Sequence, residues 1–308
     1  MTRVAAIDCG TNSLRLLVAD LDPVTGRAVD VERRTTIVRL GQDVDRTGRF
    51  AEEALRRVFR TLDEFVDVIE TTRPDHVRFV GTSAVRYVSN RQTLLDGVVA
   101  RLGVAPDVIS GPMEAQLSYD GVTRGLAART GSDFAEPYVV VDIGGGSTEL
   151  VSRPLGHDDV RAQSLDIGSV RITERHLHGD PPTAVELTAA VHDIDAALDT
   201  AELSEVGTLI GVAGTVTTMA AMVLGLPEYD RNQIHHARLP TEDLLRSCHE
   251  IVRMTVAERR RFGFMDPGRA DVIAGGALVV AAVVRRAGVD ALVASEHDLL
   301  DGIAWSLL

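Results

Sequence analysis

Near its start the chain reads Val4-Ala-Ala-Ile-Asp8-Cys-Gly10-Thr-Asn-Ser13-Leu-Arg15-Leu, which is a hydrophobic run, an acidic residue, a polar turn and a second hydrophobic run. The same order returns in Val139-Val-Val-Asp142-Ile-Gly144-Gly-Gly-Ser147-Thr-Glu149-Leu. Aliphatic runs on both sides of Gly, Ser and Thr are typical of a strand–turn–strand hairpin. The two Asp residues lie 134 positions apart (142 minus 8), about the length of one small domain. The sequence therefore predicts one hairpin of the same design in each of two domains.

Both hairpins carry the residue types that bind phosphate. Their turns present backbone N–H groups and hydroxyls to phosphate oxygens, and an Asp beside such a turn can hold Mg²⁺. Three consecutive glycines are poor strand residues, so the second turn needs either a positive φ or a close approach of a ligand. The predicted phosphate contacts are Thr11, Asn12, Ser13, Gly144, Gly145, Gly146, Ser147 and Thr148. The predicted metal ligands are Asp142, Glu149 and Asp8, although Glu149 also fits a surface charge at a strand edge.

Composition and charge limit the function classes. The chain has 308 residues, 45% hydrophobic, 25% charged and 4% aromatic, a composition typical of an Ala/Val/Leu-rich α/β protein with two domains. The net charge of −13 argues against nucleic acid as a partner and repels any polyanion. A phosphate site here must therefore combine arginines, N–H groups and metal ions. The longest apolar run, 272–284, is shorter than the roughly 18 residues that span a bilayer. The N-terminus carries no secretion pattern, so we expect a cytoplasmic protein that does not enter a membrane, and Cys9 and Cys248 suit a reducing compartment as well as any other.

The order of the remaining segments supports two similar domains. Three strands (4–7, 14–20, 29–38) precede a helix at 51–71, a strand at 77–81, a strand at 104–109 and a helix at 113–128. The second half repeats this opening at 138–143, 148–152 and 161–167, and then has a strand at 209–212, helices at 216–224, 241–255 and 269–286, and a strand at 291–294. We expect an α/β protein with an N-terminal domain at 1–122 and a C-terminal domain at 123–296, and a helix at about 297–308 that can pack back on the first.

These residues resemble the exopolyphosphatase and guanosine pentaphosphate phosphatase family, within the actin-like ATPase and sugar-kinase superfamily. Besides the two hairpins, the resemblance rests on Leu40-Gly-Gln-Asp-Val-Asp-Arg-Thr-Gly48, Gly81-Thr-Ser-Ala-Val-Arg86, Ile109-Ser-Gly111-Pro-Met-Glu114 and Arg269-Ala-Asp271-Val-Ile-Ala-Gly-Gly276. It implies two actin-like (ribonuclease H-like) domains, each a mixed five-stranded sheet flanked by helices, with a cleft between them. The chain stops where longer relatives add a helical HD-type domain, which favours short substrates. His297-Asp298 imitates an HD signature, and we interpret it as structural.

The family places its catalytic carboxylate at Glu114, which the resemblance makes the general base. Arg86 is the predicted phosphate-binding cation, and Arg15 fits either a phosphate ligand or a residue of the domain interface. Arg269 and Asp271 fit a helix start better than a substrate contact, and His235-His236 fits a metal pair poorly because adjacent side chains diverge. The segment from Gly211 to Thr217 resembles the adenosine-side turn of the superfamily.

The predicted activity is Mg²⁺-dependent (or Mn²⁺-dependent) release of terminal orthophosphate from linear, short-chain inorganic polyphosphate. Two alternatives stay open at this point. One is a guanosine pentaphosphate 5′-phosphohydrolase, and the other is a non-catalytic sensor of guanosine tetra- or pentaphosphate. A metabolite kinase of the same superfamily is disfavoured, because its base is normally an Asp rather than the Glu that follows Gly111-Pro112. We expect a homodimer.

Overall fold

The computed structural model describes residues 1–127, 134–154, 160–203 and 206–308, with side chains described up to 124 in the first of these ranges. The chain divides into two compact units. Unit 1 is Met1–Thr130 together with His297–Leu308, and unit 2 is Gly131–Glu296. The polypeptide therefore leaves unit 1, builds unit 2, and returns to unit 1 for its last helix.

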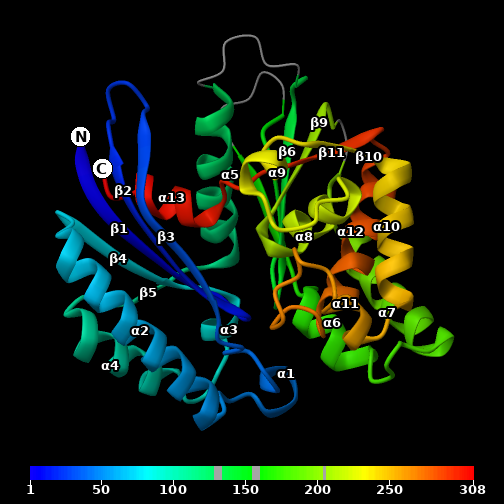
Figure 1. The fold of residues 1–308 in the computed structure, drawn as a ribbon, viewed down its shortest axis with the longest axis horizontal. Helices are drawn as coiled ribbons and strands as arrows, with labels where there is room; N and C mark the ends of the chain where they lie inside the picture. Colours follow the sequence, from blue (N-terminus) through cyan, green and yellow to red (C-terminus); the bar gives the residue numbers. More distant parts are fainter. Residues whose placement is uncertain (128–133, 155–159, 204–205) are drawn as a thin grey trace. The chain divides into compact units, whose positions relative to one another are not determined.

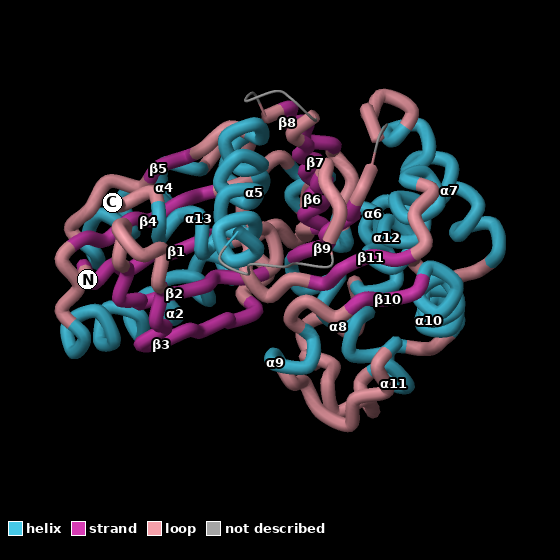
Figure 2. The backbone as a smooth tube through the Cα atoms, turned by 90° about the horizontal axis from the view of Figure 1, so that it is seen from above, coloured by secondary structure: helices cyan, strands magenta, loops and turns pink. Residues whose placement is uncertain are grey.

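Unit 1 has a five-stranded mixed sheet in the order β3-β2-β1-β4-β5. Strands β1 (Thr2–Cys9), β2 (Ser13–Leu21) and β3 (Ala28–Ile37) form an antiparallel meander, and β4 (His76–Gly81) and β5 (Asp107–Val108) run parallel to β1. The helices of unit 1 are α1 (Val44–Thr47), α2 (Glu52–Thr72), α3 (Ser83–Arg86), α4 (Arg91–Leu102), α5 (Gly111–Ala127) and α13 (Leu299–Trp305). Figures 1 and 2 show α2 and α4 on one side of the sheet and α5 and α13 on the other.

Alternation along β1 produces these two layers. Ala5 and Ile7 point to the α2/α4 side and belong to one apolar cluster, whereas Val4 and Ala6 belong to a second cluster with Leu299 and other residues of α13. All of these side chains are fully or almost fully buried. The sheet of unit 1 is therefore a central layer with helices on both faces, as expected for an α/β domain.

Unit 2 repeats the meander and has a six-stranded sheet in the order β10-β11-β9-β6-β7-β8. Its strands are β6 (Tyr138–Ile143), β7 (Thr148–Ser152), β8 (Arg161–Leu165), β9 (Thr208–Val212), β10 (Arg238–Pro240) and β11 (Ala291–Ala294). Strands β9 and β11 are parallel to β6, as β4 is to β1. The sixth strand departs from the predicted five, because the short β10 pairs antiparallel with β11 at the edge.

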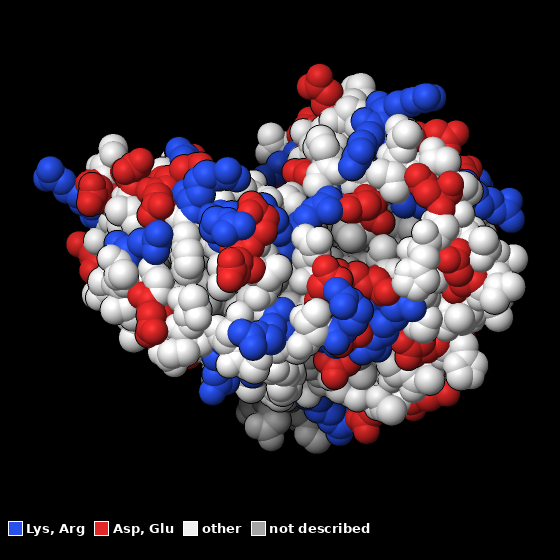
Figure 3. Space-filling model, turned by 90° about the horizontal axis from the view of Figure 1, so that it is seen from below, with Lys and Arg blue, Asp and Glu red and all other residues white. Residues whose placement is uncertain are grey.

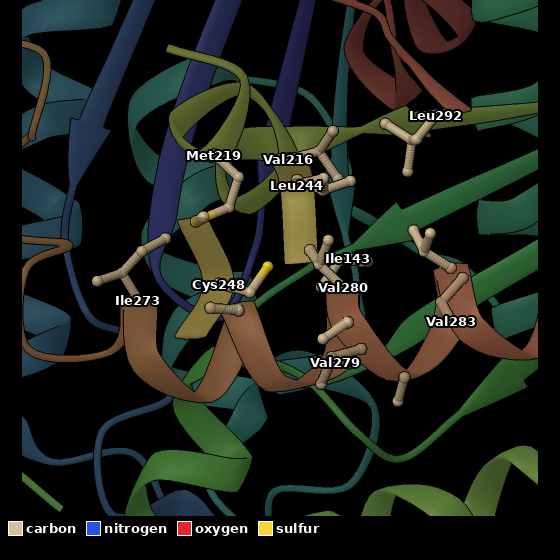
Figure 4. Close-up of a cluster of buried hydrophobic side chains, with 14 of the residues drawn as sticks. Ile143, Val216, Met219, Leu244, Cys248, Ile273, Val279, Val280, Val283 and Leu292 are labelled. Carbon is tan, nitrogen blue, oxygen red and sulfur yellow. The ribbon is translucent and has the colours of Figure 1, made fainter. Parts of the chain in front are cut away.

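The helices of unit 2 are α6 (Ser169–His176), α7 (Ala184–Leu198), α8 (Ala213–Val223), α9 (Arg231–Ile234), α10 (Thr241–Arg253), α11 (Val256–Arg259) and α12 (Ile273–Ala287). Figure 4 shows how α12 supports the core: its Ile273, Val280 and Val283 lie among side chains from α8, α10 and the sheet. Leu244 and Cys248 come from α10 and Ile143 comes from the end of β6. The apolar run at 272–284 is therefore a buried core helix, as the sequence indicated.

On the face drawn in Figure 3, basic and acidic side chains lie next to one another in several mixed groups, with uncharged surface between them. Within the described part of the chain, no helix combines the length and apolarity that crossing a membrane requires. A phosphate site must accordingly be built from a few local groups.

Candidate active site

The two predicted hairpins have the same geometry. In unit 1 the Gly10 N–H donates to the Ser13 carbonyl at 3.0 Å, and in unit 2 the Gly144 N–H donates to the Ser147 carbonyl at 3.0 Å. Asp8 is the register partner of Arg15 across β1 and β2, and Asp142 is that of Glu149 across β6 and β7. The repeat seen in the sequence is therefore also a repeat in the structure, because the two hairpins share the same strand register and the same hydrogen bond across the turn.

The second turn is held by its carbonyl groups. The Gly144 carbonyl accepts from the Ser169 N–H, and the Gly145 carbonyl accepts from the N–H groups of Val170 and Arg171, at 2.9 to 3.1 Å. The Gly146 carbonyl accepts from Arg171 Nε at 2.6 Å. In a trans peptide the N–H of the next residue points opposite to the carbonyl. The N–H groups of Gly145, Gly146 and Ser147 therefore point away from α6, and successive N–H groups directed in this way are suited to an anion.

The first turn is held in the same way by the segment that follows β3. The Asn12 carbonyl accepts from the N–H groups of Val38 and Arg39 at 2.9 Å, and the Thr11 carbonyl accepts from the Gly41 N–H at 2.8 Å. The N–H groups of Asn12 and Ser13 are therefore directed away from that segment. Each unit thus presents a turn of oriented N–H donors at the end of its first strand.

Backbone conformation and close packing distinguish the glycines at and beside the second turn. None of the glycines at 144–146 has a positive φ, so the alternative of a left-handed turn is not realised. A Cβ on Gly144 would lie 3.2 Å from the Ser147 carbonyl oxygen, within the turn itself. A Cβ on Gly168 would lie 2.6 to 2.8 Å from backbone atoms of Gly145 and Gly146, so position 168 has no room for a side chain.

Asp142 and Glu149 form the acidic part of the second hairpin. As register partners they share a face, where facing Cβ atoms lie about 4.5–5.5 Å apart. Asp142 is 6% exposed and Glu149 is 1% exposed, and Ser164 Oγ donates to Glu149 Oε1 at 2.7 Å. Ser164, which the sequence analysis did not single out, is the register partner of Glu149 on β8.

The residues present fit a magnesium ion. Mg²⁺ is usually bound through one or two carboxylates together with substrate phosphates and water, which is what this hairpin offers. Among the described residues, no three His, Cys, Asp or Glu side chains gather into a metal site. The assignment of Asp142, Glu149 and Asp8 as ligands of this ion stays a prediction.

Asp8 has a different environment from Asp142. Its Oδ2 accepts from Arg15 Nε at 2.9 Å, and Arg15 also forms an ion pair with Asp298, the N-cap of α13. Burial raises the pKa of Asp8 in spite of the Arg15 charge. Burial also opposes ionisation of Asp298, but the charge and hydrogen bonds of Arg15 hold its pKa below the usual value. Arg15 thus has two carboxylate partners inside unit 1, and Asp298 has the structural role expected of it.

The predicted base and the predicted phosphate cation lie together. Arg86 Nη1 is 3.0 Å from Glu114 Oε2, with side-chain exposures of 10% and 8%. Arg86 ends α3, which follows β4, and Glu114 is in the first turn of α5, which follows β5. The carboxyl ends of β1, β4 and β5 lie at one edge of the parallel part of the sheet, so this pair is at the same edge as the first turn.

Several polar atoms at this edge are buried with no hydrogen-bond partner among the described residues. They are Asp8 Oδ1, Asn12 Oδ1, Ser83 Oγ and Arg86 Nε. Buried polar atoms are normally paired, and exceptions mark a ligand, ion or water site. Ser83 is a candidate that the sequence analysis missed, although it lies within the quoted segment from Gly81 to Arg86. These atoms make the edge of the unit 1 sheet at the carboxyl ends of β1, β4 and β5 a candidate binding site for a polar ligand.

Other predicted residues have internal roles. Thr148 is fully buried, and its hydroxyl donates to the Ile167 carbonyl at 2.7 Å. Its hydroxyl proton is therefore not available to phosphate, contrary to the prediction. Arg269 Nη1 donates to Thr218 Oγ1 at 2.9 Å, in agreement with a structural role. The prediction that the adjacent His235 and His236 side chains diverge is wrong, because their ring centroids lie 3.7 Å apart.

Comparison with known proteins places the chain in a family. Residues 17–308 match the Ppx/GppA phosphatase family. Exopolyphosphatase 2 of Mycobacterium tuberculosis is 48% identical, over 100% of this chain and 99% of that protein. A crystal structure described as an exopolyphosphatase-like protein has a TM-score of 0.93 at 44% identity and covers 99% of this chain and 97% of its own. The Aquifex aeolicus PPX-GPPA enzyme has a TM-score of 0.81 at 30% identity, with 99% of both chains covered. The chain belongs to the Ppx/GppA phosphatase family of enzymes.

Proposed function

We propose that this enzyme is an exopolyphosphatase, which releases terminal orthophosphate from linear inorganic polyphosphate by attack of water. The relative that is 48% identical is named exopolyphosphatase 2, and the match covers 99% of its length. The observation that carries the proposal is the buried Arg86–Glu114 pair at the same sheet edge as the first oriented turn. It combines a proton acceptor and a phosphate cation with N–H donors.

Glu114 is the proposed general base. Attack of water on the terminal phosphorus forms a P–O bond, breaks the bond to the bridging oxygen, and transfers a water proton to the Glu114 carboxylate. The products are orthophosphate and a chain one phosphate shorter. The position of Glu114 in the first turn of α5, at the sheet edge that also carries the first turn, supports this role, because a base must be able to reach the water that it activates.

Arg86 is proposed to bind the non-bridging oxygens. A guanidinium has five N–H donors in a planar fork, so it can contact Glu114 and phosphate at once. Its buried Nε has no hydrogen-bond partner among the described residues and is one donor that phosphate could use. Arg86 would thereby hold the base and the phosphate in a fixed relation.

The N–H groups of the two turns are proposed to bind phosphate oxygens, and Asp142 and Glu149 to hold Mg²⁺. When bound, the ion neutralises charge on the phosphates and stabilises the charge that develops during transfer. The chain needs this contribution because its net charge is −13. The same negative field opposes long polyanions most, so we propose short chains as the preferred substrate.

A second candidate is hydrolysis of guanosine pentaphosphate. A relative from Photobacterium profundum named guanosine-5′-triphosphate,3′-diphosphate pyrophosphatase is 27% identical, over 99% of this chain and 59% of that protein. Both substrates end in a phosphoanhydride, so the same base and cation would serve.

The test is phosphate release from short polyphosphate, long polyphosphate, guanosine pentaphosphate and ATP, each with and without Mg²⁺. We expect the highest kcat/KM for short polyphosphate with Mg²⁺. Faster hydrolysis of guanosine pentaphosphate would replace the proposal by the second candidate. Binding of these compounds with no phosphate release would show a sensor instead of an enzyme.

A further inference from the structure

We propose that Arg171 is a positioning residue, which sets the direction of the N–H groups in the second phosphate-binding turn. The inference rests on the proposed function in one respect, namely that this turn binds a phosphate of the substrate. The mechanism proposed above assigns no role to Arg171. This residue donates to carbonyl groups of the turn, which lie on the side opposite to the N–H groups of the turn.

Arg171 makes two contacts with consecutive peptide groups of the turn. Its backbone N–H donates to the Gly145 carbonyl at 3.1 Å, and its Nε donates to the Gly146 carbonyl at 2.6 Å. The carbonyls of Gly144 and Gly145 are held by backbone N–H groups at the start of α6, whereas the Gly146 contact comes from a side chain. A substitution at 171 therefore releases one peptide group and leaves the others held.

The released peptide group is the one that carries the Ser147 N–H. Glycine has more backbone freedom than any other residue, so a Gly146–Ser147 peptide without a carbonyl partner can rotate. Rotation would turn the Ser147 N–H away from the direction shared with Gly145 and Gly146. The charged donor on the Gly146 carbonyl also polarises this peptide and strengthens its N–H as a donor.

The Arg171 side chain is itself held in place. It is 19% exposed, and Nη2 lies 3.6 Å from Asp166 Oδ1, in the segment between β8 and α6. Gly168 in the same segment packs on the glycine turn with no room for a Cβ. Residues 166–171 thus form one support for the turn, in which Arg171 supplies the contact that depends on a side chain.

Amide NMR signals and ligand affinity measured together test this role. The parent and Arg171→Ala are titrated with imidodiphosphate and Mg²⁺ while the ¹⁵N–H signals of Gly145, Gly146 and Ser147 are followed. We expect Ser147 to lose most of its ligand-induced shift in the variant, and the affinity to fall about tenfold, since a hydrogen bond to a charged group is worth roughly that or more. Signals of Thr11, Asn12 and Ser13 should respond in both proteins.

Arg175→Ala is the matched control. Arg175 is on the same helix and pairs with Asp193, away from the turn. It should behave as the parent. Added guanidinium ion should restore part of the lost affinity in Arg171→Ala and have no such effect in Arg175→Ala. If Arg171→Ala does not fold, Arg171→Lys takes its place, because an ammonium keeps the charge but lacks the planar Nε donor.

The inference would be overturned if Arg171→Ala kept the Ser147 shift and the affinity of the parent. It would also be overturned if Arg175→Ala lost as much affinity and Ser147 shift as Arg171→Ala. The result is separable from the proposed function, because the titration needs no turnover. If the parent releases no phosphate but its Ser147 signal responds as described, the hydrolase proposal fails and the role of Arg171 stands. If imidodiphosphate shifts none of the turn signals in the parent, the turn does not bind phosphate and the inference falls with it.

Discussion

Arg15 and Glu149 occupy equivalent positions in two hairpins of the same design, each opposite an Asp seven residues earlier in the chain. In unit 1 this position holds a cation, which pairs with Asp8 and Asp298. In unit 2 it holds a second carboxylate, buried beside Asp142. Two buried carboxylates facing each other repel unless a cation or proton lies between them. For this reason we propose the hairpin of unit 2, and not that of unit 1, as the metal site.

Activity should require a divalent cation. The enzyme in excess chelator should keep at most a few per cent of its activity, and Mg²⁺ or Mn²⁺ should restore it. Asp142→Asn should raise the metal concentration needed for half-maximal activity and lower kcat, whereas Asp67→Asn, an exposed carboxylate on α2, should change neither. Mn²⁺ binding measured by calorimetry gives the same comparison without turnover. Full activity in chelator would exclude the assignment.

Glu114→Gln should separate binding from catalysis. The change keeps size and polarity but removes the base, and general-base catalysis contributes about 10²–10⁴-fold. We expect kcat to fall by that order while short polyphosphate binds at least as tightly, since a negative charge next to phosphate is removed. Turnover near that of the parent would move the base to another group, with Glu149 as the first candidate.

Arg86→Ala should raise KM more than it lowers kcat. An arginine that contacts the phosphate in both the ground state and the transition state contributes uniform binding, and its loss appears in KM. Arg46→Ala removes an arginine from an exposed pair with Asp43 and serves as the control. Because Arg86 also touches Glu114, the double variant with Glu114→Gln should lose less than the sum of the two single losses. A variant altered in kcat alone would contradict the binding role.

Arg15→Met should destabilise unit 1 in a way that depends on pH. Removing the cation leaves Asp8 and Asp298 buried without it, and breaking such a pair costs about 3–5 kcal/mol. In the parent, folding lowers the pKa of Asp298, so this group stabilises the fold above the unfolded value of about 4 and the contribution is lost as pH falls.

In Arg15→Met we expect burial to raise the pKa of both Asp8 and Asp298. The stability of the variant should therefore fall as pH rises above the unfolded pKa of about 4. The difference in unfolding free energy between parent and Arg15→Met should therefore grow from pH 4 to pH 7. Urea denaturation at several pH values measures it. A difference that stays constant or shrinks with rising pH would show that Arg15 does not compensate these charges.

Features set by local pattern could be predicted from the sequence. The hairpins at Asp8 and Asp142 combine aliphatic runs with a turn, and both appear with equivalent register. The helix α2 has one clear apolar stripe, and its observed bounds differ from the predicted ones by one residue at each end. Glu114 and Arg86 were predicted separately, and the structure brings them within 3.0 Å, although Arg86 ends the short helix α3 and does not open a helix.

Features set by distant segments could not be predicted in this way. The sequence analysis predicts no helix at 91–102, because α4 has a weak apolar pattern, and it predicts no strand at β10, which has only three residues. Arg171 contacts a carbonyl 25 residues earlier in the chain, and no local signal marks that contact. The predicted homodimer, cytoplasmic location and cleft between the domains stay predictions, as do the metal and the chain-length preference.

The return of the chain to unit 1 for α13 has a consequence for its synthesis. Leu299, Leu300 and Ile303 cover the face of the first sheet that includes Val4, Ala6 and Leu17, and Asp298 completes the charge pairing of Arg15. On the ribosome, residues 1–130 emerge long before these groups exist, so their sheet has an uncovered apolar face and an incomplete ion cluster. Unit 2 is contiguous and can close as soon as it has emerged. The domain that begins first should therefore mature last, and a nascent chain halted before residue 297 would expose a surface that chaperones recognise.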